Sequence, residues 1–180
     1  WCDWSSDVCS SDLDMMLALS VSGKTPWVWG AMRHAWSLGS TVALITEDAQ
    51  SEAAQLASMV IAPDLGADVV AGYTNAKAGI AQSMILHMIT TGLAVRSGRV
   101  YSNLRVDLEA SNTRWAERQI AIVMEAGGCS RAQAKAALES CNHQCKTAVL
   151  MVLTGLDAWK AHELLAQNNG FVRLALQEAP

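Results

Sequence analysis

Three short, continuously apolar segments constrain the fold of this chain more than any other feature. They cover residues 15–20, 41–46 and 59–62. Unbroken apolar runs of this length are typical of strands buried on both faces of a parallel sheet. Helical patterns occupy residues 27–38 and 51–56 between them. Because strands that alternate with helices pair in parallel through right-handed crossovers, the sequence predicts an α/β fold.

From about Thr74 onward the apolar pattern is helical throughout. One long helix is predicted over residues 76–96, with one stripe formed by Ile80, Met84, His87, Met88 and Thr91. A loop is expected over residues 97–107. The chain is therefore predicted to divide into an α/β part, residues 14–110, and a small all-α module, residues 111–180.

The all-α module is predicted to contain four short amphipathic helices. They are expected over residues 112–126, 131–140, 145–153 and 158–167. Ser130 and Asp157 precede two of these helices, at positions where an N-cap side chain belongs. A self-contained interaction module is one interpretation of this part, although nothing in its sequence indicates a partner.

The first thirteen residues, WCDWSSDVCSSDL, do not fit the rest of the chain. They contain a near-repeat of Ser-Ser-Asp, no basic residue and no helix or strand period. A disordered acidic tail is one interpretation. A closer resemblance is to the conceptual translation of a sequencing-library adaptor, because two Trp and two Cys are unusual in a solvating tail. Residues 1–13 are therefore excluded from the fold prediction.

Composition excludes several classes of protein. Hydrophobic residues make up 51% and charged residues 17% of the 180, which is typical of a globular chain. The net charge of −4 argues against nucleic acid or an anionic membrane as a partner. The apolar run over residues 84–95 is interrupted by His87, Thr90 and Thr91, so no membrane span is expected. No basic residue precedes an apolar stretch at the N-terminus, so no signal peptide is expected.

The segment over residues 20–25 is the best candidate for a binding site. It joins a predicted strand to a helix that begins near Pro26, where backbone N–H groups and the helix dipole attract anions. The side chains that would bind a phosphate monoester are those of Ser20, Ser22, Lys24 and Thr25, with Gly23 allowing close approach. An ordinary turn with Thr25 as N-cap is the alternative, and the spacing of a Walker A loop is absent.

Acidic and metal-ligating residues give weaker signals. Glu47, Asp48 and Glu52 cluster after the second strand, where a solvated helix start explains them equally well. Cys141, His143 and Cys145 have poor spacing for a zinc site, so reduced, half-buried cysteines are favoured there, as at Cys129. The other histidines are His34, His87 and His162, of which His87 is the one that could face a cleft. No Ser/His/Asp or Cys/His arrangement is suggested, and no metal is expected.

Several stretches together resemble one family of enzymes. They are SVSGKTPWVWGAMRHAWSLG, GADVVAGYTNAKAGIAQ, LHMITTGLAVRSGRVYSNLRVDLEASN, EAGGCSRAQAKAALE and KTAVLMVLTGLDA. The first is similar to the Ser-Gly-Arg-Thr-Pro loop and helix of the N-acetylmuramic acid 6-phosphate etherases, which have the sugar isomerase (SIS) phosphosugar-binding fold. The resemblance extends from Asp14 to about Leu176, and its most specific parts contain Lys77, Asn103, Asp107 and Asn112.

The resemblance implies a lyase that acts on a phosphorylated amino sugar. Such enzymes cleave the D-lactyl ether of N-acetylmuramic acid 6-phosphate, giving N-acetylglucosamine 6-phosphate and D-lactate. They need no metal or organic cofactor and work as cytoplasmic homodimers in peptidoglycan recycling. The resemblance implies phosphate binding by the loop that contains Ser20, Ser22, Gly23, Lys24 and Thr25. Thr74 and Lys77 are possible further substrate contacts.

The chain departs from the family pattern in three places. Gly72-Tyr73-Thr74-Asn75 stands where the family has Gly-Ser-Ser/Thr-Arg, and His87 replaces an Asn. The family's two catalytic glutamates and its other Ser-rich loop belong upstream of the part matched from Asp14. The sequence is therefore predicted to be a C-terminal fragment without catalytic residues, inactive alone and prone to aggregate at the strand over residues 15–19. A non-catalytic sugar-phosphate-binding regulator of the same fold is the alternative.

Overall fold

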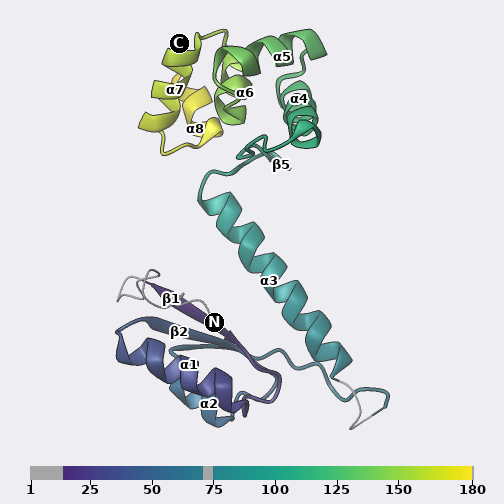
Figure 1. Ribbon diagram of the computed structural model, residues 1–180, viewed down its shortest axis with the longest axis vertical. Coiled ribbons are helices and arrows are strands. Elements are labelled where there is room, and N and C mark those ends of the chain that lie inside the picture. Colours follow the sequence, from purple (N-terminus) through teal and green to yellow (C-terminus); the bar gives the residue numbers. More distant parts are fainter. Residues whose placement is uncertain (1–13, 71–74, 180) are drawn as a thin grey trace. The chain divides into compact units, whose positions relative to one another are not determined.

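The computed structural model describes residues 14–70 and 75–179 and divides into two compact units (Figure 1). Unit 1 covers Trp1–Met88 and unit 2 covers Ile89–Pro180. The boundary between the units falls inside a long helix, and the predicted division into residues 14–110 and 111–180 stays a prediction. The adaptor-like interpretation of residues 1–13 and the predicted contact of Thr74 lie outside the described residues.

Unit 1 contains a parallel sheet in the order β1-β2-β3. The strands are β1 (Met15–Leu19), β2 (Thr41–Ile45) and β3 (Met59–Ile61). Met15 is in register with Thr41, and Ala43 with Met59. The crossover helices are α1 (Pro26–Ser37) and α2 (Glu52–Leu56). The predicted α/β alternation and parallel pairing are confirmed.

One face of this sheet forms the core of unit 1. Ala18, Val42 and Leu44 alternate along their strands onto the same face, where they pack with buried residues of α1 and α2. The helix residues in this core are Val28, Met32, Ala35, Ala53 and Ala54. Met32 and Leu44 are fully buried. Both helices therefore lie on one side of the sheet, where they bury its even-numbered positions.

The predicted long helix is α3 (Ala76–Arg96), and its bounds are those expected from the sequence. Only Ala78 and Ile85 are buried on it. Among the described residues it is long and apolar enough to cross a membrane by length and composition, with a mean hydropathy of 1.4 over an 18-residue window. The sequence analysis expected no segment long and apolar enough to span a membrane, and by length and composition that expectation is wrong. His87, Thr90 and Thr91 lower the mean hydropathy of α3 too little to change this.

A short hairpin follows α3 where the sequence predicted only a loop. Its strands are β4 (Val100–Tyr101) and β5 (Leu104–Arg105), paired antiparallel. Ser102 in the turn has a φ of 55°, a left-handed conformation that non-glycine residues seldom adopt. Strands of two residues are too short to show an alternating apolar pattern, which explains why sequence periodicity missed them.

The rest of unit 2 is a bundle of five short helices. They are α4 (Thr113–Gly127), α5 (Arg131–Ser140), α6 (Cys145–Thr154), α7 (Ala158–Gln167) and α8 (Val172–Glu178). Four were predicted, and α8 was not. Ser130 and Asp157 accept the expected capping hydrogen bonds from the N–H groups of Gln133 and Lys160. A continuous core joins all five helices, with Val123, Ala134, Val149, Leu150 and Ala175 fully buried.

Candidate functional site

The predicted phosphate loop lies at the carboxyl end of β1, directly before α1. Ser20 is buried, and its N–H donates to the carbonyl of Ile45 at 3.1 Å. The hydroxyls of Ser20 and Thr25 are 3.0 Å apart, and the N–H of Gly23 donates to the carbonyl of Ser20 at 3.3 Å. These bonds close residues 20–25 into a compact turn whose base is anchored in the sheet.

The loop is tied to the neighbouring loop that follows β2. The Val21 carbonyl accepts both the Thr46 hydroxyl at 3.1 Å and the Glu47 N–H at 3.0 Å. Thr46 is buried. Gly23 has a φ of +62°, and a Cβ placed on it would come 2.1 Å from Ser51 Oγ. Glycine at this position therefore allows the two loops to approach at the edge of the sheet where ligands of open α/β folds bind.

The first turn of α1 has no negative charge and no side-chain cap that would oppose the binding of an anion. Thr25 occupies the N-cap position as predicted, but its side chain makes no cap hydrogen bond with the helix, because its hydroxyl contacts Ser20. The first turn contains no acidic residue, and Pro26 begins it. Lys24 is exposed beside it, and Ser22 Oγ accepts the Lys24 N–H at 3.3 Å. Backbone N–H groups, hydroxyls and one ammonium group thus occur together, a combination suited to a phosphate.

The nearby acidic residues have local structural roles. Asp48 Oδ1 accepts the N–H of Gln50 at 2.9 Å, which stabilises the turn after β2. Glu52 lies in the first turn of α2, where Ser51 Oγ accepts the N–H of Ala54 at 3.3 Å. Glu47 and Glu52 are exposed. These contacts agree with the interpretation of this cluster as a solvated helix start.

Lys77, the second predicted substrate contact, lies in the first turn of α3. Its ammonium group donates to the carbonyl of Leu65 at 3.2 Å and to that of Ala67. The side chain is half-buried and joins α3 to the segment that follows β3. In this structure Lys77 therefore stabilises a local connection, and any contact with substrate remains a prediction.

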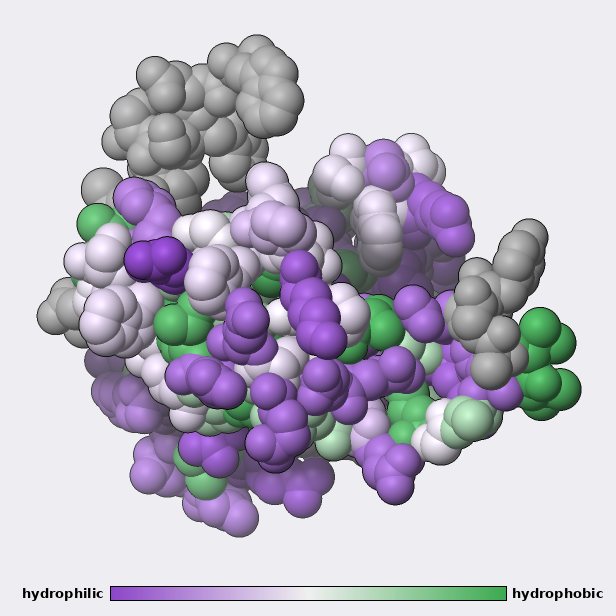
Figure 2. Space-filling model, turned by 90° about the horizontal axis from the view of Figure 1, so that it is seen from below, coloured by the Kyte–Doolittle hydropathy of each residue, from purple (hydrophilic) through white to green (hydrophobic). Residues whose placement is uncertain are grey.

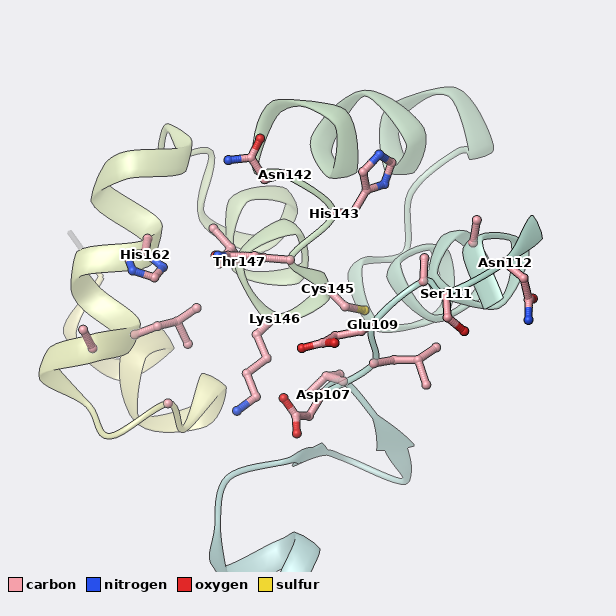
Figure 3. A pocket seen from close by; sticks show the side chains of 18 of the residues that line it. Asp107, Glu109, Ser111, Asn112, Asn142, His143, Cys145, Lys146, Thr147 and His162 are labelled. Atoms are coloured by element: carbon pink, nitrogen blue, oxygen red, sulfur yellow. Dashed lines mark hydrogen bonds between the residues drawn. The ribbon is translucent and has the colours of Figure 1, made fainter. Parts of the chain in front are cut away.

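Unit 2 contains a cavity of about 1050 Å³ that sequence reasoning did not find. Its walls are the segment over residues 106–113, the turn before α6, and α7. Figure 3 shows the side chains of Lys146, Asp107 and Glu109 directed into the same space. Gln119 joins two of these walls. Its side-chain Nε2 donates one hydrogen bond to the carbonyl of Leu108 and another, at 2.9 Å, to the carbonyl of His143. In the sequence, the feature that could have indicated this cavity was the family-specific stretch that contains Asp107 and Asn112.

The three described cysteines are free thiols of unit 2. Cys141 and Cys145 are buried, not half-buried as expected, and the Cys141 thiol donates to the carbonyls of Gln144 at 3.4 Å and Leu138 at 3.6 Å. Burial raises the pKa of Cys141, and burial together with neighbouring Cys141 raises the pKa of Cys145 to about 12. Both thiols are therefore neutral near pH 7, which makes them poor nucleophiles and poor metal ligands.

The fold and the loop before α1 define an α/β protein whose strand-to-helix turn has the composition predicted for an anion-binding loop. No protein-family model matches the chain. It is 50% identical over 166 residues to N-acetylmuramic acid 6-phosphate etherase of Klebsiella aerogenes, covering 92% of this chain and 55% of that protein. The protein of the same name from Aliivibrio fischeri strain MJ11 is 46% identical over 172 residues, covering 96% and 57%. The one from Edwardsiella ictaluri is 47% identical over 168 residues, covering 93% and 56%.

The resemblance inferred from the sequence is therefore confirmed. The chain is homologous over nearly all of its length to proteins named N-acetylmuramic acid 6-phosphate etherase. It spans little more than half of the length of the curated relatives it matches. It thus corresponds to a part of such a protein.

Proposed function

We propose that this chain is the phosphate-binding part of an N-acetylmuramic acid 6-phosphate etherase. Support comes from identities of 46–50% over 92–96% of the chain with proteins of that name. The open first turn of α1, flanked by Ser22 and Lys24, supplies a site of matching charge. The sheet of unit 1 is, in this proposal, part of a SIS-type phosphosugar domain. The complete enzyme is a cytoplasmic homodimer that needs no cofactor.

The proposed reaction explains why the phosphate site matters. The D-lactyl ether is lost by elimination from the opened sugar, and water then adds, so that a base and an acid must meet the substrate at fixed positions. A tightly held phosphate sets those positions. The hydroxyls of Ser20, Ser22 and Thr25, the α1 N-terminus and Lys24 do this in the proposal. The base and the acid come from glutamates that this chain does not supply.

The purified 180-residue chain is expected to release no D-lactate from N-acetylmuramic acid 6-phosphate. Without a base near the sugar carbon that loses its proton and an acid near the ether oxygen, phosphate binding alone leaves the barrier to elimination unchanged. An enzymatic D-lactate assay measures this, with the intact Klebsiella aerogenes relative as the positive control. Lactate release by the chain at the rate of that control would contradict the proposed division of roles.

Replacing Lys24 with glutamine is expected to weaken binding of N-acetylglucosamine 6-phosphate by about tenfold to a hundredfold. A hydrogen bond to a charged group contributes about 1.5–3 kcal/mol, and glutamine keeps a polar side chain, one atom shorter, without the charge. Isothermal titration measures the affinity, and Lys135→Gln is the matched control, because Lys135 is an exposed lysine of α5 that pairs with Glu139 at 3.7 Å. Equal affinities of the Lys24→Gln and Lys135→Gln variants would rule out Lys24 as a phosphate ligand.

The alternative function, a non-catalytic regulator of the same fold, has no specific observation in its favour. All three relatives described above have the etherase name. The departures that suggested a regulator include Tyr73, which lies outside the described residues. The etherase is therefore the function that we propose.

A further inference from the structure

The proposed function makes no use of the cavity in unit 2. Its volume of about 1050 Å³ is at the upper end of the range for small-molecule sites, which measure roughly 300–1,000 Å³, and is larger than a single amino acid needs. The described residues on the face shown in Figure 2, in contrast, are mainly hydrophilic, with hydrophobic residues at separate places. Scattered apolar side chains of that kind need no partner to explain them.

The walls of the cavity are held in place by hydrogen bonds and by backbone conformation. Gln119 is fully buried, and its amide donates to the carbonyls of Leu108 on one wall and His143 on another. Asn142 and His143 have φ values of 52° and 57°, in the left-handed region. Such conformations persist where the surroundings fix them, and they are frequent around ligand sites. The cavity is therefore formed before any ligand enters it.

One wall of the cavity carries a positive charge at the start of α6. Lys146 lies in the first turn of this helix, is half-buried, and is directed into the cavity (Figure 3). A Cβ on Gly170 would lie 3.3 Å from its Nζ, so glycine leaves room for the ammonium group. Within the described part of the chain this group makes no ion pair or hydrogen bond. The first turn has no acidic residue, and Gln144 makes no side-chain cap, so this wall favours an anionic group.

The wall formed by residues 106–113 carries a negative charge. Asp107 and Glu109 both extend from it into the space that Lys146 enters (Figure 3). Asp107 Oδ2 pairs with Arg99 Nε at 3.4 Å, so its charge is compensated. Glu109 has no ion pair among the residues that the structure describes. A ligand in the cavity would therefore meet one uncompensated ammonium group and one uncompensated carboxylate, on different walls.

The remaining lining is largely apolar and made of small or medium-sized side chains. Val106, Cys145 and Leu165 line the cavity and are buried in the core of unit 2. Ala116 and Ala166 also line it. A surface of this kind favours short aliphatic groups between the two charged ends of a ligand.

We propose that the unit 2 cavity binds a short zwitterionic peptide with small aliphatic side chains. Its carboxylate would contact Lys146 and the N–H groups of α6, and its ammonium group would contact Glu109. A free anion would face the carboxylate of Glu109 unpaired, and a free cation would face the ammonium of Lys146. A ligand with both charges balances both walls. The proposal goes beyond the etherase function and does not rest on it, because the phosphate loop belongs to unit 1 and the cavity to unit 2.

The test titrates the full chain with trialanine and follows the backbone amide signals by NMR. Shifts are expected at Thr147 and Gly170, which line the cavity, and none at Ser22 in the phosphate loop. Acetylation of the peptide amine and amidation of its carboxyl group each remove one charge. Each modification is expected to weaken binding by about threefold to tenfold, because one of the two ionic contacts is lost.

Variants of the chain identify the two contacts. Lys146→Gln is expected to weaken binding of trialanine by about threefold to tenfold and to leave binding of the peptide amide unchanged, because the partner charge is already absent there. Glu109→Gln is expected to weaken binding of trialanine similarly and to leave binding of the acetylated peptide unchanged. Lys135→Gln and Glu139→Gln are the matched controls, since these two residues form an exposed pair at 3.7 Å on α5. The amide spectrum of each variant shows whether it remains folded.

This pattern of matched losses supports the proposal. It is overturned by no binding of trialanine, by equal losses in the control variants, by an effect of Lys146→Gln that is the same for the peptide and its amide, or by acetate or phosphate that binds at Lys146 as tightly as trialanine. Binding of N-acetylglucosamine 6-phosphate that depends on Lys146 also overturns it, because the cavity would then hold the sugar phosphate. Trialanine binding without any binding of the sugar phosphate counts against the proposed function and leaves the peptide site standing.

Discussion

Replacing Gly23 with alanine is expected to destabilise unit 1 by about 2–4 kcal/mol, because two separate penalties coincide at that position. The φ of +62° is left-handed, which alone costs a non-glycine residue about 1–2 kcal/mol. The new Cβ would also lie 2.1 Å from Ser51 Oγ and 2.4 Å from Ser51 Cβ, so one of the two loops must move. Hydrogen exchange resolved by peptide measures the free energy of opening in β1 and β2.

Two further variants distinguish the backbone strain at residue 23 from the steric clash with Ser51. Gly30→Ala is the control, because Gly30 lies within α1, has no neighbour within 4 Å of an added Cβ, and is expected to gain up to about 1 kcal/mol of helix stability. The double variant Gly23→Ala/Ser51→Gly removes the collision and is expected to recover part of the loss, leaving the strain of φ. Phosphate affinity is expected to follow the same order, since the loop carries Ser22 and Lys24. An unchanged stability of Gly23→Ala would refute the close approach of the two loops.

Replacing Gln119 with glutamate is expected to destabilise unit 2 by about 3–5 kcal/mol at pH 7, as for an uncompensated buried charge. Gln119 is fully buried, and its amide donates to the carbonyls of Leu108 and His143. A carboxylate has no hydrogen to donate, and it would face the two carbonyl oxygens without water. The variant Gln119→Leu has a side chain of similar size and loses the two hydrogen bonds, but it also removes the unpartnered Oε1. It is therefore expected to destabilise unit 2 by about 2 kcal/mol.

The pH dependence distinguishes this mechanism from general disruption. Burial next to carbonyl oxygens would raise the pKa of the new carboxyl above its value in the unfolded chain, so the destabilisation should be complete at high pH and decrease as the pH falls through that raised value. The protonated carboxyl can donate one hydrogen bond. Gln167→Glu on exposed α7 is the control, and neither it nor Gln119→Leu should show this recovery. Urea unfolding at pH 7 and pH 5 measures all three variants.

The regular elements were predictable because each has a strong local signal. The strands over 15–19, 41–45 and 59–61 are continuously apolar, and α3 agrees with its prediction at both ends. Caps at Ser130 and Asp157 were found for the same reason, since a capping side chain acts on the N–H groups two or three residues later. The hairpin β4–β5 and the seven-residue helix α8 are too short to show a period.

The candidate site was predictable in composition but not in contacts. The loop over residues 20–25 was identified from Ser20, Ser22, Gly23, Lys24 and Thr25, and its place before α1 agrees with that prediction. The sequence could not show that Thr25 bonds to Ser20 and leaves α1 without a side-chain cap. It could not show that Lys77 donates to two backbone carbonyls, because these belong to residues ten and twelve positions away.

The sequence by itself determined the α/β order of unit 1, the helical character of unit 2 and the relationship to the etherases, because periodicity and motif spacing are properties of neighbouring residues. Only the tertiary structure decided which apolar residues are covered. It showed that Met84 and Met88 are exposed although they are as apolar as Met32, which is fully buried. Burial depends on what packs against a residue from elsewhere in the chain or from a partner, and local sequence does not encode that.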